Sequence, residues 1–125
     1  MSVEIRDDRA RGVLEAVDGG EVVGHIAYFT LDVPGTESDE VPGGAAETAL
    51  VPVHTEVASA REGQGVAGKL TAELYAIAGR EGASVAPLCS YVVKWAERHP
   101  EQAPAASGAL MRAALDKVRT DPSAW

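Results

Sequence analysis

The first part of the chain alternates apolar and polar positions with the period of a β-strand. This pattern predicts a short strand at residues 3–5, an Asp-Asp turn, a second strand over 11–17 and a hairpin turn at Gly19-Gly20. Residues 21–31 are rich in β-branched and aromatic side chains, so they predict a longer strand leading away from that turn. We therefore expect three antiparallel strands at the start of the fold.

Further along, the period changes from that of a strand to that of a helix. Residues 50–58 predict another strand, and the apolar positions after residue 65 predict a helix that ends near Gly79 or Gly82. Residues 84–88 then predict a strand, residues 91–98 a helix interrupted at His99-Pro100, and residues 107–118 a final amphipathic helix. The helical positions after the glycine-rich turn are Val66, Leu70, Leu74, Ile77 and Ala78.

Residues 32–49 lack apolar periodicity. They contain two Pro-Gly steps and five acidic residues, and this composition cannot bury enough apolar surface to offset the entropy lost on ordering. We predict a flexible, acidic loop inserted between two strands, poorly ordered without ligand and dispensable for folding.

The composition limits the class of protein and its partners. A chain of 125 residues suits a single small domain, and its net charge of -8 argues against binding to nucleic acid or to anionic membranes while favouring a cationic amine. Cys89 is the only cysteine, and no signal peptide or membrane-spanning run is evident, so we expect a cytoplasmic location. The three histidines show no metal-ligand spacing, and we expect no metal site.

The most informative motif is the glycine-rich stretch of residues 63–68, placed between a predicted strand and a predicted helix. Glycine permits close approach of the backbone to a ligand, and the free N–H groups at a helix N-terminus bind phosphate oxygens. The motif thus predicts a site for a phosphate-bearing cofactor. The structural alternative is a plain strand-to-helix connection that uses glycine for close packing.

The order of elements and three motifs together resemble the GNAT acetyltransferase superfamily, in particular its short single-domain N-acetyltransferase-like members. The resemblance covers roughly residues 9–100 and is carried by residues 53–57, by the turn at 62–67 and by Pro87-Leu88-Cys89-Ser90-Tyr91, with His99-Pro100-Glu101 beyond. It implies an α/β (α+β) fold with a mixed, mainly antiparallel sheet, a central glycine-turn helix and C-terminal helices. It also implies acetyl-CoA (coenzyme A) as the cofactor.

The resemblance implies roles for residues at the turn. The family pattern is Gln or Arg, two residues, Gly, any residue, then Gly or Ala, and its backbone amides hold the pyrophosphate of coenzyme A. In this chain Glu62 stands at the first position, with Arg61 one place earlier. Carried over, Val57 would pair with the pantetheine amides, and the pyrophosphate cradle would comprise Gly63, Gln64, Gly65, Val66 and Ala67.

Four residues are candidates for catalysis of acetyl transfer to an amine. Strand alternation places His54 and Glu56 on one face, opposite Thr55 and Val57, where either could remove a proton from the amine. The resemblance places Cys89 beside the acetyl group, with Tyr91 two residues on as a possible proton donor to the leaving thiolate. The structural alternatives are a satisfied imidazole, a surface acid, a small buried thiol and a packing tyrosine.

We divide the chain into an acetyl-CoA-binding domain over residues 1–103 and a C-terminal helical extension over 104–125. The predicted function is a small N-acetyltransferase that transfers acetyl by direct attack of a small-molecule or protein amine. Two other classes stay open: a noncatalytic acyl-CoA-binding module and a protein-interaction domain on the same scaffold.

Overall fold

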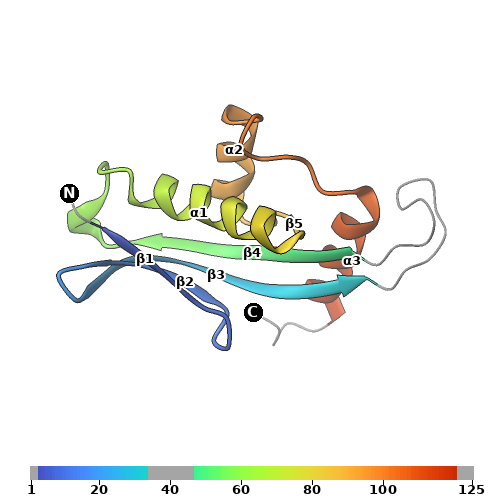
Figure 1. The fold of residues 1–125 in the computed structure, drawn as a ribbon, viewed down its shortest axis with the longest axis horizontal. Coiled ribbons are helices and arrows are strands. Elements are labelled where there is room, and N and C mark those ends of the chain that lie inside the picture. Colours follow the sequence, from blue (N-terminus) through green and yellow to red (C-terminus); the bar gives the residue numbers. More distant parts are fainter. Residues whose placement is uncertain (1–2, 34–46, 121–125) are drawn as a thin grey trace.

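The computed structural model describes residues 3–33 and 47–120. Its strands form one sheet, in which four consecutive strands are antiparallel neighbours and the last strand is parallel to the fourth (Figure 1). The strands are β1 (Glu4–Asp8), β2 (Val13–Asp18), β3 (Glu21–Val33), β4 (Glu47–Val57) and β5 (Ser84–Val85). The predicted mixed, mainly antiparallel sheet is confirmed.

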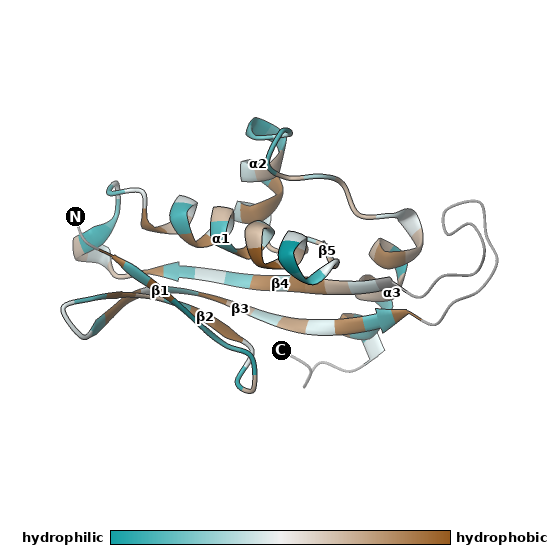
Figure 2. Ribbon diagram, viewed as in Figure 1, coloured by the Kyte–Doolittle hydropathy of each residue, from teal (hydrophilic) through white to brown (hydrophobic). Residues whose placement is uncertain are grey.

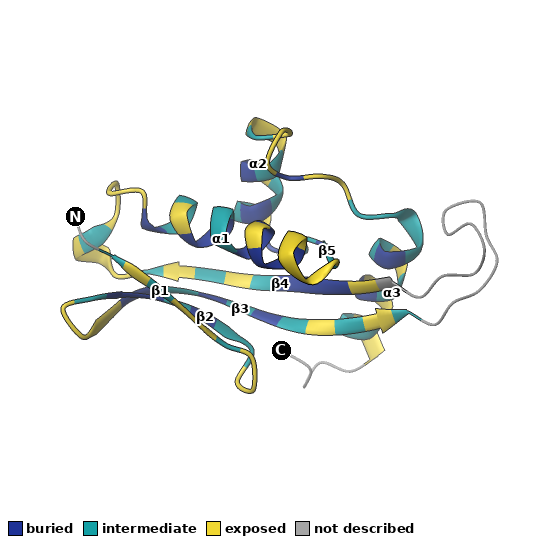
Figure 3. Ribbon diagram, in the orientation of Figure 1, coloured by how far each residue is buried: buried dark blue, intermediate teal, exposed yellow. Residues whose placement is uncertain are grey.

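Helices cover both faces of this sheet. On one face, α1 (Val66–Glu81) buries its apolar stripe against β2, β3 and β4, and α2 (Ser90–Arg98) packs beside it through Trp95 (Figures 1 and 3). On the other face, α3 (Gly108–Thr120) buries Leu110 and Ala114 against Ala49 and Val51 of β4. The helix predicted at 107–118 therefore packs on the sheet, and the two-part division of the chain stays a prediction.

The apolar face of α1 comes close to the sheet because β3 carries a glycine beneath it. A Cβ at Gly24 would lie 2.9 Å from Val66 Cγ1 and 3.2 Å from the backbone oxygen of Glu56. Glycine at this position therefore lets the first turn of α1 rest directly on β3 and β4. Hydrophobic residues of α1 face the sheet while its outer surface is hydrophilic (Figure 2).

Several element boundaries differ from the sequence prediction. Asp7 and Asp8 belong to β1, and the turn that follows spans residues 9–12, so β2 begins at Val13. β3 and β4 extend into the predicted loop at residues 32–33 and 47–49, where they pair with each other, and the remainder of that loop lies outside the described residues. α1 ends at Glu81 with Gly82 in the left-handed conformation, which confirms the second of the two predicted ends.

The predicted strand at 84–88 is wrong in its length, because β5 comprises only Ser84 and Val85. Two prolines account for the difference. Neither Pro52 in β4 nor Pro87 after β5 has an N–H to donate to the ladder between these strands. Past β5, the backbone amides of Leu88 and Cys89 both donate to the Pro52 carbonyl, at 3.1 and 3.0 Å. Beyond this point the two segments separate.

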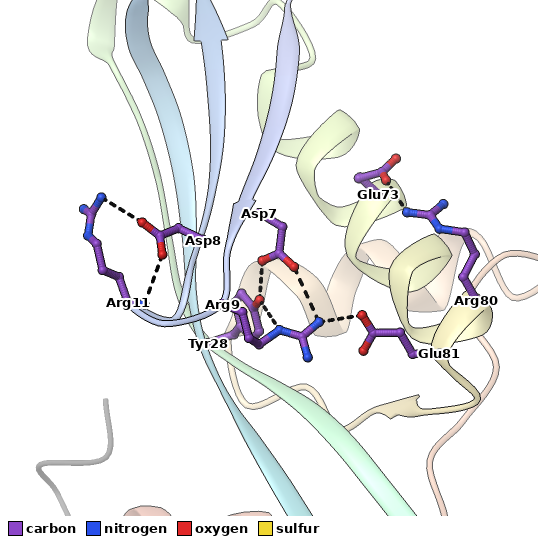
Figure 4. A network of polar contacts seen from close by, with 8 residues as sticks. All are labelled: Asp7, Asp8, Arg9, Arg11, Tyr28, Glu73, Arg80 and Glu81. Carbon is purple, nitrogen blue, oxygen red and sulfur yellow. Dashed lines mark hydrogen bonds and ion pairs between the residues drawn. The ribbon is translucent and has the colours of Figure 1, made fainter.

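Polar contacts fasten β1 to the end of α1 (Figure 4). The Tyr28 hydroxyl donates to Asp7, and Arg9 Nε donates to the Tyr28 oxygen at 3.0 Å. Arg9 also pairs with Glu81 at 2.7 Å. Burial and the hydrogen bond to Asp7 raise the pKa of Tyr28 to about 12, so this phenol is neutral over the physiological range. The aspartate in β1 thus has a structural partner on β3.

Candidate functional site

A cleft of about 420 Å³ lies where β4 ends and α1 begins. Its walls come from the last residues of β4, the glycine turn, the first turn of α1 and the start of α2. Residues that line it include Thr55, Val57, Gly63, Gly65, Val66 and Tyr91. A concave site of this size with few polar groups is typical of a small-molecule or cofactor site.

The glycine turn gives the cleft its backbone donors. After a short 3-10 turn at Ser59–Arg61, Gly63 and Gly65 adopt φ values of 83° and 80°, a conformation that other residues rarely take. Gly65 is the N-cap of α1 and its carbonyl accepts the amide of Lys69 at 3.0 Å, so the amides of residues 66–68 come before the first helical hydrogen bond. No side chain caps them.

These free amides and the helix dipole favour an anion at the mouth of the cleft. Of the predicted cofactor residues, Val57, Gly63, Gly65, Val66 and Ala67 line the cleft, whereas Gln64 is exposed and is not part of the lining. The residues present therefore fit a phosphate-bearing cofactor held by backbone groups.

A cation also borders the turn. Arg61 lines the cleft and pairs with Asp18 of β2 at 2.7 Å, and both side chains are about a quarter exposed. The pair holds the guanidinium against the end of β2. Glu62, which stands where the resemblance implies Arg or Gln, lines the same cleft.

Of the predicted catalytic residues, Tyr91 lies on the cleft and Cys89 lies behind it. The Tyr91 hydroxyl is 3.7 Å from the position that a Cβ on Gly68 would take, so it faces the first turn of α1. Cys89 is 9% exposed, and its Sγ lies 3.3 Å from the Oγ1 of Thr55, within hydrogen-bond reach for sulfur. Thr55 thus links the buried thiol to the cleft wall.

The other two predicted catalytic residues lie on the opposite face of β4. His54 and Glu56 are exposed, 58% and 66% by side chain, and their Nε2 and Oε2 atoms are 3.6 Å apart. A register shift in the pairing of β3 with β4 leaves Val53 as an extra residue, but Thr55 and Val57 still alternate with His54 and Glu56. The structure therefore brings His54 and Glu56 together but does not bring them into the cleft.

Sequence reasoning named neither Thr55 nor His25 as a site residue, and it gave Gly68 no role beyond its place in the glycine-rich stretch. The alternation that placed Thr55 beside Val57 was a usable signal for the cleft wall, and Gly68 belongs to the same glycine-rich stretch. His25 carried no such signal, because its neighbours depend on the pairing of β3 with β4. That pairing sets His25 directly opposite Glu56.

The fold and the cleft together define an α+β domain with a cleft beside a glycine turn at a helix N-terminus. The model of the GCN5-related N-acetyl-transferase family matches residues 14–106 of the chain. This match spans most of the sequence, and the chain belongs to the GCN5-related N-acetyl-transferase family. A comparison with curated protein sequences finds no match.

Two solved structures to which the chain is similar are distant in sequence. A ribosomal-protein-alanine N-acetyltransferase from Brucella melitensis biovar Abortus 2308 is 24% identical with a TM-score of 0.51, over 75% of this chain and 62% of its own. An aminoglycoside acetyltransferase from an uncultured soil metagenomic sample is 23% identical with a TM-score of 0.47, over 62% of this chain and 45% of its own. The chain therefore spans only about half of the length of these structures. None of the helices in the described ranges is long and apolar enough to cross a membrane.

Proposed function

We propose that this protein is a small acetyl-CoA-dependent N-acetyltransferase that transfers acetyl to an amine by direct attack. The observation that carries the proposal is the row of uncapped amides at the first turn of α1, which opens onto the cleft beside the end of β4. Membership of the GCN5-related N-acetyl-transferase family supports the same chemistry. Acetyl-CoA would supply the reactive thioester.

The chain's own residues would bind and orient this cofactor. The uncapped amides of residues 66–68, next to Gly63 and Gly65, would hold the pyrophosphate, with Arg61 as a cation of the same cleft lining. Since β5 separates from β4 after Pro52, the edge of β4 toward Val57 would offer its backbone groups to the pantetheine amides. A backbone N–H at this edge would also stabilise the oxyanion that forms during attack.

Proton transfers would involve both sides of β4. Tyr91 is the hydroxyl of the cleft lining that faces the first turn of α1, and we assign it the donation of a proton to the leaving thiolate. His54 and Glu56 face solvent on the other side of β4, so either would accept the proton of an amine only if the acceptor approaches from that face. An amine with an ordinary pKa near 10.4 needs such a base at neutral pH.

The test is a calorimetric titration with coenzyme A, followed by turnover measurements on a panel of amines. We expect binding to the parent, much weaker binding to Gly65→Val, and turnover with at least one amine. Equal affinity in a folded Gly65→Val protein would contradict the cradle. Binding without turnover would identify a noncatalytic acyl-CoA module, and no binding would favour a protein-interaction domain.

A further inference from the structure

Three side chains converge on the face of the sheet opposite α1, away from the proposed cofactor cleft. His25 projects from β3, and His54 and Glu56 project from β4. The Nε2 of His25 is 3.9 Å and the Nε2 of His54 is 3.6 Å from the Oε2 of Glu56. One potential ligand atom from each residue lies within 4.8 Å of the other two.

The pairing of β3 with β4 produces this convergence. His25 and Glu56 are direct partners in the antiparallel register, so their side chains project from the same face of the sheet. His54 is two residues before Glu56 on β4 and therefore lies on that face as well. The two imidazole rings are 6.0 Å apart between centroids and are tilted by 53°, so they are not stacked against each other.

We propose that His25, His54 and Glu56 bind a divalent transition-metal ion, with Zn²⁺ as the best match. Two imidazoles and one carboxylate are a common donor set for zinc sites that keep a fourth position open. Ligands of a tetrahedral zinc lie about 3.4 Å apart, given metal–ligand distances of about 2.0–2.1 Å. Rotations of the exposed His54 and Glu56 side chains and of the half-buried His25 would close the remaining gap. Imidazole ligands disfavour Mg²⁺ and Ca²⁺, which prefer oxygen.

The charges around the cluster also suit a cation. Glu15 of β2 is the direct register partner of His25 and adds a second carboxylate to this face. The next residue across the sheet, Arg6 of β1, forms an ion pair with Glu4 at 3.2 Å. A metal here would join β3 to β4, and its binding does not depend on the proposed acetyl transfer.

The alternative is a surface histidine–carboxylate cluster with no affinity for metal, and a zinc titration separates the two. The full chain, without a histidine tag and without coenzyme A, is titrated with zinc chloride by calorimetry. We expect one Zn²⁺ per chain, with an affinity at least about tenfold weaker in His54→Ala, Glu56→Gln and His25→Ala. Asp32→Asn is the matched control, because it removes an exposed carboxylate near the far end of β3, and it should bind like the parent.

Cobalt provides a second readout that is independent of activity. Co²⁺ bound by this donor set would give visible absorption bands that are lost in the same three variants. A thiolate charge-transfer band would instead identify Cys89 as a ligand and overturn the assignment. Absence of zinc binding by the parent, or parent-like affinity in the variants, would also overturn it. Should His25→Ala not fold, the variants of the two more exposed residues decide the question.

Discussion

Replacing Gly68 by leucine tests the cleft without straining the turn. Gly68 lies in the first helical turn of α1, and a Cβ there would lie 3.6 Å from Trp95 Nε1 and 3.7 Å from the Tyr91 hydroxyl, which are ordinary contacts. Trp95 is only 6% exposed, so the rest of a leucine side chain has room mainly on the cleft side. The substitution should therefore fill the cleft while the helix stays intact.

The matched control is Gly79→Leu in the same helix. A Cβ at Gly79 meets no atom within 4 Å, and the residue is exposed. In both variants the loss of a helical glycine should favour folding by about 0.5–1 kcal/mol. Only at Gly68 should a phosphate lose contact with an amide, and one charge-assisted hydrogen bond is worth about 1.5–3 kcal/mol, or roughly 10- to 150-fold in Kd.

Calorimetric titration with coenzyme A and thermal unfolding measure the two effects separately. We expect Gly68→Leu to bind about 10- to 150-fold more weakly than Gly79→Leu, while both melt at or above the temperature of the parent. If a folded Gly68→Leu protein bound coenzyme A as tightly as the control, the cofactor would not occupy this cleft. Loss of affinity in both variants would point to a change in α1 as a whole.

Three further outcomes follow from single side chains. Arg61→Gln should weaken coenzyme A binding in calorimetry. It should lower the free energy of unfolding by only about 0.2–1 kcal/mol, because its ion pair with Asp18 is partly exposed. Unchanged affinity would show that Arg61 is not part of the site. Cys89→Ala should keep substantial activity, because no basic residue stands next to the thiol in the sequence to activate it. An acetyl-thioester trapped on Cys89, together with an inactive alanine variant, would refute this. Burial raises the pKa of Tyr28 to about 12, above the ordinary value near 10. The folded state therefore holds this proton more tightly than the unfolded state, and stability should fall as the pH rises from 10 to 12. Denaturant titrations of the parent and Tyr28→Phe check this, and an equal loss in both would show that Tyr28 is not responsible.

Local patterns were enough to predict the helices and most strands. The helical spacing from Val66 to Ala78 depends on one segment alone, and the structure has α1 there. The length of β5 could not be predicted in this way, because it depends on the pairing with β4, where neither Pro52 nor Pro87 can donate a backbone hydrogen bond. Asp7 is likewise a turn residue by composition, but it lies in β1, where it is the register partner of Leu14 and its carboxylate accepts the Tyr28 hydroxyl.

The same distinction between local patterns and strand pairing applies to the candidate site. Its glycine turn is a contiguous motif, so the residues that line the cleft at Gly63 and Gly65 could be predicted from the sequence. The cluster of His25, His54 and Glu56 joins residues about thirty positions apart, and it exists only in one register of β3 against β4. A slip of one residue in that register would have placed His25 on the opposite face.

The alternation along β4 also limits how the proposed reaction is arranged. Thr55 and Val57 face the cofactor cleft, and His54 and Glu56 face the other side, so a base from this strand cannot reach an amine that enters from the cleft side. Direct attack with such a base therefore requires the acceptor amine to approach from the face of the sheet opposite α1, where β4 continues beyond its pairing with β5. Zinc at His54 and Glu56 would occupy that base. Under the proposed mechanism, the metal and the acceptor amine would then compete for the same side of β4.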